Sequence, residues 1–386
     1  MIDAVFGTGF SGSPRAPADA AIEAMNSSGA PIVAADIASG VDAATGEVQG
    51  AAAMARLTVS FHAAKLGQWI APGKWHSGAL RTVAIGIPAG GPVEPRAGLI
   101  EPGVLSLAPA RGARSNKFTS GQVLVVGASR GLTGAVCMAS EAAIRAGAGY
   151  ATVAIPRDLE PIVEVKLTEV MSIGCPGPEG RLGAEAEESI LAAAGDAAAV
   201  VLGPGMGTGE DSFELARSVA RHLSGPLLID ADGLNAHAGQ LELLRERSGP
   251  TVLTPHAGEL GRLLGRPSEE ISARRVAAAT EAAERAGAIV VLKGDDTLIT
   301  DGSRLAVNGV ASPGLATAGS GDVLSGAIAA LIARGLGPYE AACAGVLAHA
   351  RAGRHAAERV GVSSVIATDV IASLPVGLDP AVRMAE

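Results

Sequence analysis

Residues 316–326 read Ala-Thr-Ala-Gly-Ser-Gly-Asp-Val-Leu-Ser-Gly, and their types and spacing are suited to phosphate chemistry. The pattern predicts a glycine-rich turn that opens a helix over 323–334, with Gly335 as its C-terminal cap. The first N–H groups of a helix lack intrahelical acceptors, and the helix dipole favours an anion in front of them. We therefore expect an anion hole at this turn. Its predicted backbone donors are Ala318, Gly319, Ser320 and Gly321.

Asp322 is the carboxylate of this turn, and two interpretations of it are open. It could be an N-terminal helix cap, which is the usual role of an Asp at a helix start. It could instead take a proton from a hydroxyl group that attacks a phosphate held in the anion hole. The turn alone does not decide between these roles, so the neighbouring motifs are needed.

Five short apolar segments predict strands that each end in a polar or glycine-rich cluster. Open α/β sheets bind ligands beyond the carboxyl ends of their strands, so these clusters should converge along one sheet edge. The predicted strands are 122–126, 199–202, 227–229, 251–253 and 289–292, and the clusters are 127–135, 203–207, 230–235, 254–259 and 293–297.

Single side chains in these clusters have both a structural and a functional interpretation. Asp230, Asp232 and Asn235 could supply oxygen ligands to Mg²⁺, or they could hold a turn through Asx hydrogen bonds. His256 could hold a substrate, although a single histidine is more often structural. Lys293 could offer its charge to a phosphate or could stand in a plain turn. Taken together, the clusters predict an α/β enzyme that holds a phosphorylated ligand near Asp322.

Composition limits the class of protein further. The net charge of −9 argues against nucleic acid as the main partner, because phosphate neutralisation needs clustered Lys and Arg. The N-terminus lacks a charged region typical of a signal peptide, and the apolar stretch 323–333 is shorter than the ~20 residues of a membrane span. Three isolated cysteines suggest a reducing compartment, so we expect a cytoplasmic enzyme.

The elements that must position these residues suggest two domains, as expected for 386 residues. The N-terminal part alternates predicted strands with a helix over 17–26, which indicates about half of a doubly wound parallel-sheet domain. A stretch rich in Pro and Gly follows and predicts a linker. The predicted N-terminal strands are 2–6, 31–35, 57–61 and 80–85, and the predicted divisions are 1–90, a linker over 91–115, and 116–380.

The order of the motifs makes the interpretation specific. Asn-Lys-Phe at 116–118 precedes Leu-Gly-Pro-Gly-Met-Gly, Asp-Ala-Asp-Gly-Leu-Asn, Leu-Thr-Pro-His-Ala-Gly-Glu, Leu-Lys-Gly-Asp-Asp-Thr and the turn at 316–326. From about 116 to 375 the chain closely resembles the ADP-dependent NAD(P)H-hydrate dehydratase family, a branch of the ribokinase-like superfamily. The resemblance implies a ribokinase-like three-layer α/β/α domain. Residues 2–87 resemble the second half of a Rossmann-like NAD(P)H-hydrate epimerase domain, so the whole resembles bifunctional nicotinamide-nucleotide repair enzymes of bacteria.

The resemblance also implies roles for particular residues in the C-terminal domain. The residues implied to contact hydrated NADH or NADPH are Ala135, Gly205, His256 and Asp322, and those implied to contact ADP are Lys293, Gly294, Asp295, Asp296, Thr297 and Gly321. In this chemistry Asp322 would deprotonate the ring hydroxyl as it attacks the β-phosphate of ADP, and the anion hole would stabilise the transferring phosphoryl group. The ring nitrogen would then expel phosphate, leaving NAD(P)H and AMP.

The N-terminal half lacks the Asn-Asn-Gly-Gly-Asp-Gly type of loop that opens the epimerase domain of the family. We therefore expect this polypeptide to have lost epimerase activity and to hold at most an incomplete K⁺ site, formed by Asp3 and Ser39. The remaining residues implied for the epimerase substrate are Gly7, Thr8, Gly9, Phe10, Ser11, Gly12, Ser13 and Asp36.

Two other functions are compatible with these motifs. A small-molecule kinase of the same superfamily would share the anion hole and Asp322 but would leave a stable phosphate ester. A non-catalytic sensor of adenine nucleotides would need no base beside the phosphate, so Asp322 argues against it. The Gly-Thr-Gly at 7–9 is only a weak indication of an oxidoreductase. The Ala-rich helices make a homo-oligomer plausible.

Overall fold

The computed structural model describes residues 1–88, 90, 95–113 and 115–382. The chain divides into two compact units, of which one comprises Met1–Gly98 with Pro267–Ala278 and the other comprises Leu99–Arg266 with Ala279–Glu386. No helix in the described ranges combines the length and the apolar character that crossing a membrane requires.

The N-terminal unit contains a four-stranded sheet whose strands follow one another in chain order and are all parallel. Its strands are β1 (Ile2–Asp3), β2 (Val33–Ala35), β3 (Leu57–Phe61) and β4 (Ala79–Val83), and its helices are α1 (Ala18–Ser27), α2 (Gly73–Ser77) and the 3₁₀ helix η1 (Leu66–Gln68). Ile22 of α1 packs with Ala34 and Ile37 in a small buried core. This arrangement agrees with half of a doubly wound domain.

The C-terminal unit is built on a ten-stranded sheet in the order β5-β14-β13-β12-β11-β10-β9-β6-β7-β8. The seven strands from β12 to β8 are parallel, and β13 forms antiparallel pairs with β12 and β14. The strands are β5 (Ala97–Leu99), β6 (Gln122–Val126), β7 (Tyr150–Pro156), β8 (Met171–Cys175), β9 (Ala199–Leu202), β10 (Leu227–Ile229), β11 (Thr251–Leu253), β12 (Ile289–Leu292), β13 (Leu298–Thr300) and β14 (Leu305–Val307).

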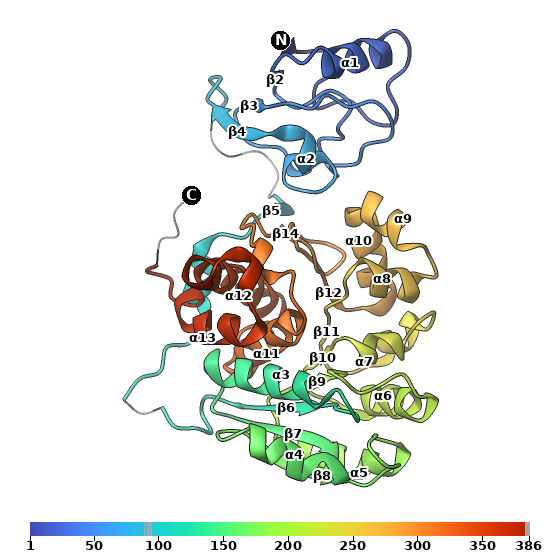
Figure 1. The fold of residues 1–386 in the computed structure, drawn as a ribbon, viewed down its shortest axis with the longest axis vertical. Coiled ribbons are helices and arrows are strands. Elements are labelled where there is room, and N and C mark those ends of the chain that lie inside the picture. Colours follow the sequence, from blue (N-terminus) through green and yellow to red (C-terminus); the bar gives the residue numbers. More distant parts are fainter. Residues whose placement is uncertain (89, 91–94, 114, 383–386) are drawn as a thin grey trace. The chain divides into compact units, whose positions relative to one another are not determined.

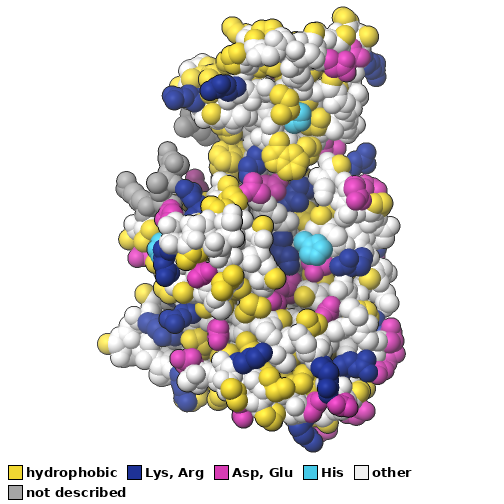
Figure 2. Space-filling view, viewed as in Figure 1, with side chains coloured by type: hydrophobic (Ala, Val, Ile, Leu, Met, Phe, Trp, Pro, Cys, Tyr) yellow, Lys and Arg dark blue, Asp and Glu magenta, His cyan; other side chains and the backbone are white. Residues whose placement is uncertain are grey.

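Helices cover both faces of this sheet and form three layers (Figure 1). One face carries α3 (Thr133–Arg145), α11 (Ser320–Ala333), α12 (Pro338–Val360) and α13 (Ala367–Gly377). The other face carries α5 (Glu187–Ala194), α6 (Glu210–His222), α7 (Asp232–Asn235) and α8 (Ala257–Leu264). The remaining helices are α4 (Glu160–Lys166) and α10 (Arg275–Ala286), together with α9 (Ser268–Ala273), which belongs to the unit that contains Met1–Gly98. On the face shown in Figure 2, Lys and Arg side chains are interspersed with Asp and Glu.

Helix α11 is central to the C-terminal unit, and every residue from Val323 to Ala333 is buried. Its small residues allow close packing, because a Cβ atom at Gly326 would lie only 1.9 Å from the carbonyl oxygen of Ala139 on α3. The predicted helix over 323–334 is confirmed, although it begins three residues earlier, at Ser320. Gly335 adopts the positive φ of 98° that a helix-ending glycine favours.

Two segments differ from the expectations. The strand predicted at 2–6 ends at Asp3. The Asp3 carboxylate accepts hydrogen bonds from Ser39, and the chain leaves the sheet after this residue. In the predicted linker, residues 91–94 and 114 lie outside the described residues, but its remainder holds part of the secondary structure. It contains β5 and the 3₁₀ helix η2 (Pro102–Leu107), and Leu105 belongs to the core of the C-terminal unit.

Candidate active site

The five predicted polar clusters meet at one edge of the large sheet. Their strands, β12, β11, β10, β9 and β6, are direct neighbours and run parallel, so their carboxyl ends lie side by side. The N-terminus of α11 lies at the same place, since the carboxylate of Asp230 after β10 accepts a 2.5 Å hydrogen bond from Ser325 Oγ. The expected convergence of the strand-end clusters is therefore present.

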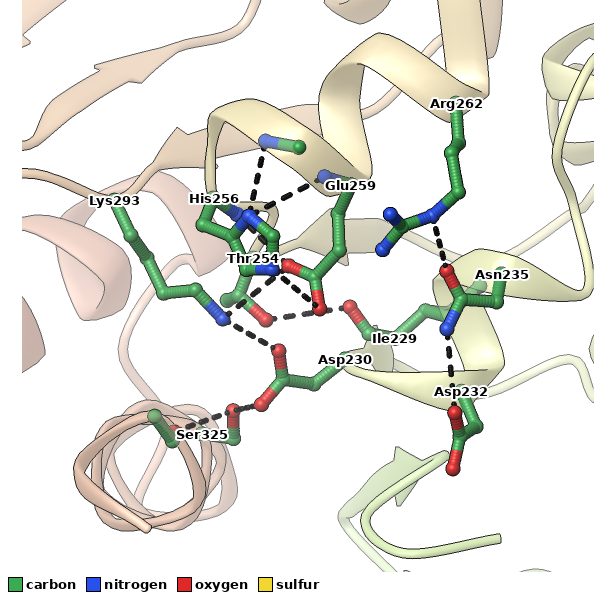
Figure 3. A network of polar contacts seen from close by, with 12 residues as sticks. Ile229, Asp230, Asp232, Asn235, Thr254, His256, Glu259, Arg262, Lys293 and Ser325 are labelled. Carbon is green, nitrogen blue, oxygen red and sulfur yellow. Dashed lines mark hydrogen bonds and ion pairs between the residues drawn. The ribbon is translucent and has the colours of Figure 1, made fainter. Parts of the chain in front are cut away.

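Asp230 is at the centre of a network of charges (Figure 3). Its side chain is only 2% exposed, and its Oδ1 lies 2.9 Å from Lys293 Nζ. The same Nζ lies 3.6 Å from Glu259 Oε2. Burial by itself would lower the pKa of Lys293, but the charges of Asp230 and Glu259 outweigh it and raise that pKa above its ordinary value. Lys293 is thus a firmly protonated cation held at the sheet edge.

Asp322 stands in the first turn of α11, and Gly319, not Asp322, occupies the N-cap position. The capping interpretation of Asp322 is therefore wrong. Burial, followed by the negative charge of Asp230, raises the pKa of Asp322 to about 8, although Lys293 opposes this shift. A carboxylate in this state binds a proton strongly once it has ionised, which is the property of a general base that works near neutral pH.

The backbone in front of Asp322 has the shape expected of an anion hole. Gly319 is left-handed with φ 84°, and a Cβ atom there would collide with Met138 Sδ at 2.4 Å. Of the predicted donors, Ser320 N–H reaches Thr317 O at 3.4 Å, whereas Ala318, Gly319 and Gly321 have no backbone acceptor among the described residues. The N–H group of Asp322, which was not predicted, has none either. The donors at the helix start, Gly321 and Asp322 among them, therefore remain available to an anion.

Five of the six residues that the resemblance assigned to ADP line one cavity of about 300 Å³. Lys293, Gly294, Asp295 and Thr297 line it together with Gly321. Asp296 does not line this cavity and is buried, with 3% of its surface exposed. A Cβ atom at Gly321 would stand 3.4 Å from Lys293 Nζ, so glycine keeps the space between the helix start and this cation open.

The residues assigned to the hydrated nicotinamide nucleotide lie at the same sheet edge on four different elements. Gly205 and Ala135 are neighbours, because a Cβ atom at Gly205 would lie 3.1 Å from Ala135 Cβ. His256 caps α8 and accepts hydrogen bonds from the N–H groups of Gly258 and Glu259 through Nδ1. Burial lowers the pKa of His256, so the neutral ring carries its proton on Nε2 and can donate it.

Asp232 and Asn235 satisfy the structural interpretation of their motif. Asp232 Oδ2 accepts a hydrogen bond from Gly207 N–H at 2.8 Å, and Oδ1 accepts one from Asn235 Nδ2 at 3.2 Å. Asn235 in turn accepts a hydrogen bond from Arg262 Nε at 2.8 Å. Among the described residues, no group of three or more acidic, His or Cys side chains is arranged to hold a metal ion.

The candidate epimerase residues lie in the N-terminal unit. Asp3 is fully buried and accepts hydrogen bonds from Ser39 N–H at 2.8 Å and from Ser39 Oγ at 2.6 Å. Asp36 forms an ion pair with Lys65. The segment predicted to bind substrate, 7–13, follows β1, and its Phe10 ring stacks on Phe6 at 4.5 Å. The K⁺ site at Asp3 and Ser39 stays a prediction, and these two groups already bind each other.

Sequence reasoning missed Ser325 and His349. Ser325 belongs to the glycine-rich motif, so a search for partners one turn beyond Asp322 would have identified it. His349 lines the same cavity from within α12 and belongs to no motif, so its sequence surroundings carry no comparable signal.

The fold and this site are those of a ribokinase-like α/β enzyme. The crystal structure of ADP/ATP-dependent NAD(P)H-hydrate dehydratase from Bacillus subtilis, co-crystallised with ATP and Mg²⁺, matches with a TM-score of 0.63 and 25% identity. The match covers 72% of this chain and 96% of that chain. A ribokinase-like superfamily protein from Enterococcus faecalis matches with a TM-score of 0.63 and 25% identity over 75% of this chain and 98% of its own.

Sequence comparisons identify the family. The NAD(P)H-hydrate dehydratase family model matches residues 123–376, and the model for the YjeF-related protein N-terminus matches residues 1–67. The bifunctional NAD(P)H-hydrate repair enzyme of Moorella thermoacetica is 38% identical over 97% of this chain and 72% of its own length. The enzyme of the same name from Escherichia coli is 34% identical over 99% of this chain and 72% of its own length. The chain belongs to the family of bifunctional NAD(P)H-hydrate repair enzymes, as the motifs predicted.

Proposed function

We propose that the C-terminal domain dehydrates (6S)-NADH hydrate or (6S)-NADPH hydrate, using ADP as the phosphoryl donor and releasing AMP and phosphate. The observation that carries this proposal is the position of Asp322. It lies beside the free N–H groups at the start of α11 and close to the Lys293 cation at a cavity of about 300 Å³. The B. subtilis relative whose structure was solved with ATP and Mg²⁺ supports the adenine nucleotide.

The chemistry begins at the hydroxyl group of the hydrated nicotinamide ring, which is a poor leaving group. Asp322 removes the hydroxyl proton as the oxygen attacks the β-phosphate of ADP, and the bond between the β-phosphorus and the bridging oxygen breaks to release AMP. The ring nitrogen lone pair then expels phosphate. Loss of a proton from the adjacent ring carbon restores the double bond of NAD(P)H.

The surrounding groups stabilise charge during the transfer. The N–H groups of Gly321 and Asp322 face the transferring phosphoryl group, and Lys293 adds a positive charge at the cavity wall. Mg²⁺ usually binds through one or two carboxylates and the phosphates of its substrate. Because both Asp230 oxygens are bound, by Lys293 and by Ser325, the phosphates would supply most ligands of the ion. When bound, the ion would neutralise phosphate charge.

The test is to supply purified protein with hydrated NADH or NADPH and ADP or ATP, and to follow the return of reduced-nicotinamide absorbance. Appearance of NADH with stoichiometric AMP and phosphate supports the proposal when ADP is the donor. A stable phosphorylated product would indicate the related small-molecule kinase activity instead. Nucleotide binding without any AMP would indicate a sensor.

For the N-terminal domain we propose that epimerase activity in this polypeptide is weak or absent. The support is that the resemblance assigns only two side chains of this chain to K⁺, the Asp3 carboxylate and the Ser39 hydroxyl. The match of residues 1–67 to a family model makes this directly testable. Pure (6R)-NADH hydrate should be repaired no faster by this chain with K⁺ than by its non-enzymatic epimerisation followed by dehydration. Faster, K⁺-dependent repair would contradict the proposal.

A further inference from the structure

The cavity beside Gly321 contains a buried histidine that the proposed chemistry does not use. His349 of α12 lines this cavity, and only 7% of its surface is exposed. Its Nε2 atom is buried and has no hydrogen-bond partner. A buried polar atom without a partner is costly, and such atoms in a native protein call for an explanation.

The charge of the His349 ring limits what its Nε2 atom can bind. The His349 ring forms a hydrogen bond with the backbone of Ser320 that raises its pKa, as a bond donated to a carbonyl does. Burial nevertheless lowers the pKa of His349 to about 4, so the ring is neutral at pH 7. Each nitrogen of a neutral imidazole either donates or accepts a hydrogen bond, so Nε2 has the capacity for one that the protein leaves unused.

A second unpartnered group lies close to the first. Ser312 also lines the cavity, and its Oγ atom is buried without a partner. Gly353 is one helical turn beyond His349 on α12, and a Cβ atom there would stand 2.4 Å from Ser312 Oγ. His349 and Gly353 are four residues apart and share one face of α12. The Ser312 hydroxyl, which lies over Gly353, is therefore on the same face as the His349 imidazole. Apolar side chains, including Val310, Leu315 and Val346, complete this wall.

We propose that His349 and Ser312 anchor the nucleoside part of the adenine nucleotide, with His349 Nε2 forming a hydrogen bond with a polar group of that nucleoside. The apolar wall favours the nucleoside over a phosphate as this partner, because burying a charged group against apolar side chains is costly. The nucleoside offers two kinds of polar partner, the ribose hydroxyls and the exocyclic amine of the base. This inference rests on the proposed use of an adenine nucleotide, and it adds His349 as a residue that recognises the nucleoside of that nucleotide.

The experiment measures binding by titration calorimetry, so that it does not depend on dehydration. The ligands are ADP, 2′-deoxy-ADP, 3′-deoxy-ADP and inosine diphosphate, in which the exocyclic amine is replaced by a carbonyl. The proteins are the wild type, His349→Phe, Ser312→Ala and the control His355→Phe, which replaces a histidine on the same helix that contacts Ser373 and does not line the cavity.

The wild type should bind one of the three analogues roughly 10-fold more weakly than ADP, because one hydrogen bond is lost. His349→Phe should bind ADP roughly 10-fold more weakly and should no longer distinguish that analogue from ADP. The analogue whose affinity differs from that of ADP in the wild type but not in His349→Phe identifies the partner of His349 as a ribose hydroxyl or the amine. His355→Phe should keep the wild-type pattern, and Ser312→Ala should weaken ADP binding by about 3-fold.

Two results would overturn the inference. One is a His349→Phe variant that binds ADP as the wild type does or keeps every analogue penalty. The other result needs no variant. If the wild-type protein binds all three analogues as tightly as ADP, His349 forms no hydrogen bond with the nucleoside. Wild-type protein that binds ADP with this pattern but forms no NADH would refute the proposed function and leave the nucleoside anchor intact. Protein that binds no adenine nucleotide would refute both.

Discussion

The two units place acidic side chains at the carboxyl ends of parallel strands, but they treat those charges differently. In the N-terminal unit, Asp3 accepts two hydrogen bonds from Ser39, and Asp36 is paired with Lys65. In the C-terminal unit, Lys293 is shared between Asp230 and Glu259, and Asp322 is held with a pKa of about 8.

This difference shows how a strand-end position becomes reactive. An acid whose oxygens are fully occupied by neutral donors and a cation is stabilised as a structural carboxylate. An acid that is buried near other acids keeps its proton and becomes a strong base when it loses it. We therefore expect substitution of Asp322 to change catalysis, and substitutions in the N-terminal cluster to change stability alone.

The largest expected effect is that of Asp322→Asn. Without a base the hydroxyl group of the substrate stays protonated, and kcat for ADP-dependent dehydration should fall by about 10³-fold. The affinity for ADP, measured by calorimetry, should stay within a few-fold, because the anion-hole N–H groups remain. A variant with kcat near that of the wild type would show that another group takes the proton.

The second prediction compares the lysines of the two clusters. Lys293→Met leaves Asp230, with 2% of its side chain exposed, beside Glu259 without a cation, and should destabilise the C-terminal unit by about 3 kcal/mol. Lys65→Met should cost about 1 kcal/mol, because the 18% exposure of the Asp36 side chain lets water replace the lysine.

Urea unfolding can follow the units separately. Both tryptophans of the chain, Trp69 and Trp75, belong to the N-terminal unit, so their fluorescence reports its unfolding, whereas circular dichroism is dominated by the larger unit. Equal destabilisation by the two lysine variants would mean that the clusters do not differ in the way proposed.

The third prediction concerns pH. Asp322 must be ionised to act as a base, and in the free protein it is mostly protonated below its pKa of about 8. The value of kcat/KM for dehydration should therefore rise about 10-fold per pH unit from pH 6, and should level off above pH 8. Initial rates at low substrate concentration measure this profile. A flat profile between pH 6 and 8 would place the ionisation of the base well below that range.

The smallest expected effect on catalysis is that of Asp3→Asn. The new amide would turn an N–H donor toward Ser39 and leave a buried hydrogen bond unmade, which should destabilise the N-terminal unit by about 2 kcal/mol. Tryptophan fluorescence should detect this loss, while kcat for dehydration of (6S)-NADH hydrate stays unchanged. Coupled loss of dehydration would contradict the division of roles between the clusters.

Much of the C-terminal fold could be predicted because its strands are continuous apolar segments bounded by glycine, proline or polar residues. The strands β6, β9, β10, β11 and β12 have the predicted bounds. Strand β8 was missed, since Met171–Cys175 is partly exposed and contains glycine, so its sequence lacks a buried-strand pattern. Strand β5 lies in a segment whose prolines and glycines predicted a linker, and its three residues depend on pairing with the sheet edge.

The sequence by itself determined the fold class, the glycine-rich turn before α11 and the family, because these depend on local patterns and on the order of motifs. Only the tertiary structure decided which charges meet. Lys293 pairs with Asp230 from 63 residues away, and Ser325 reaches the same carboxylate from 95 residues away. The raised pKa of Asp322 and the unpartnered nitrogen of His349 also arise only when distant segments bury these side chains. Burial and charge proximity depend on the order of strands in the sheet and on the helices packed against it, which no single segment specifies.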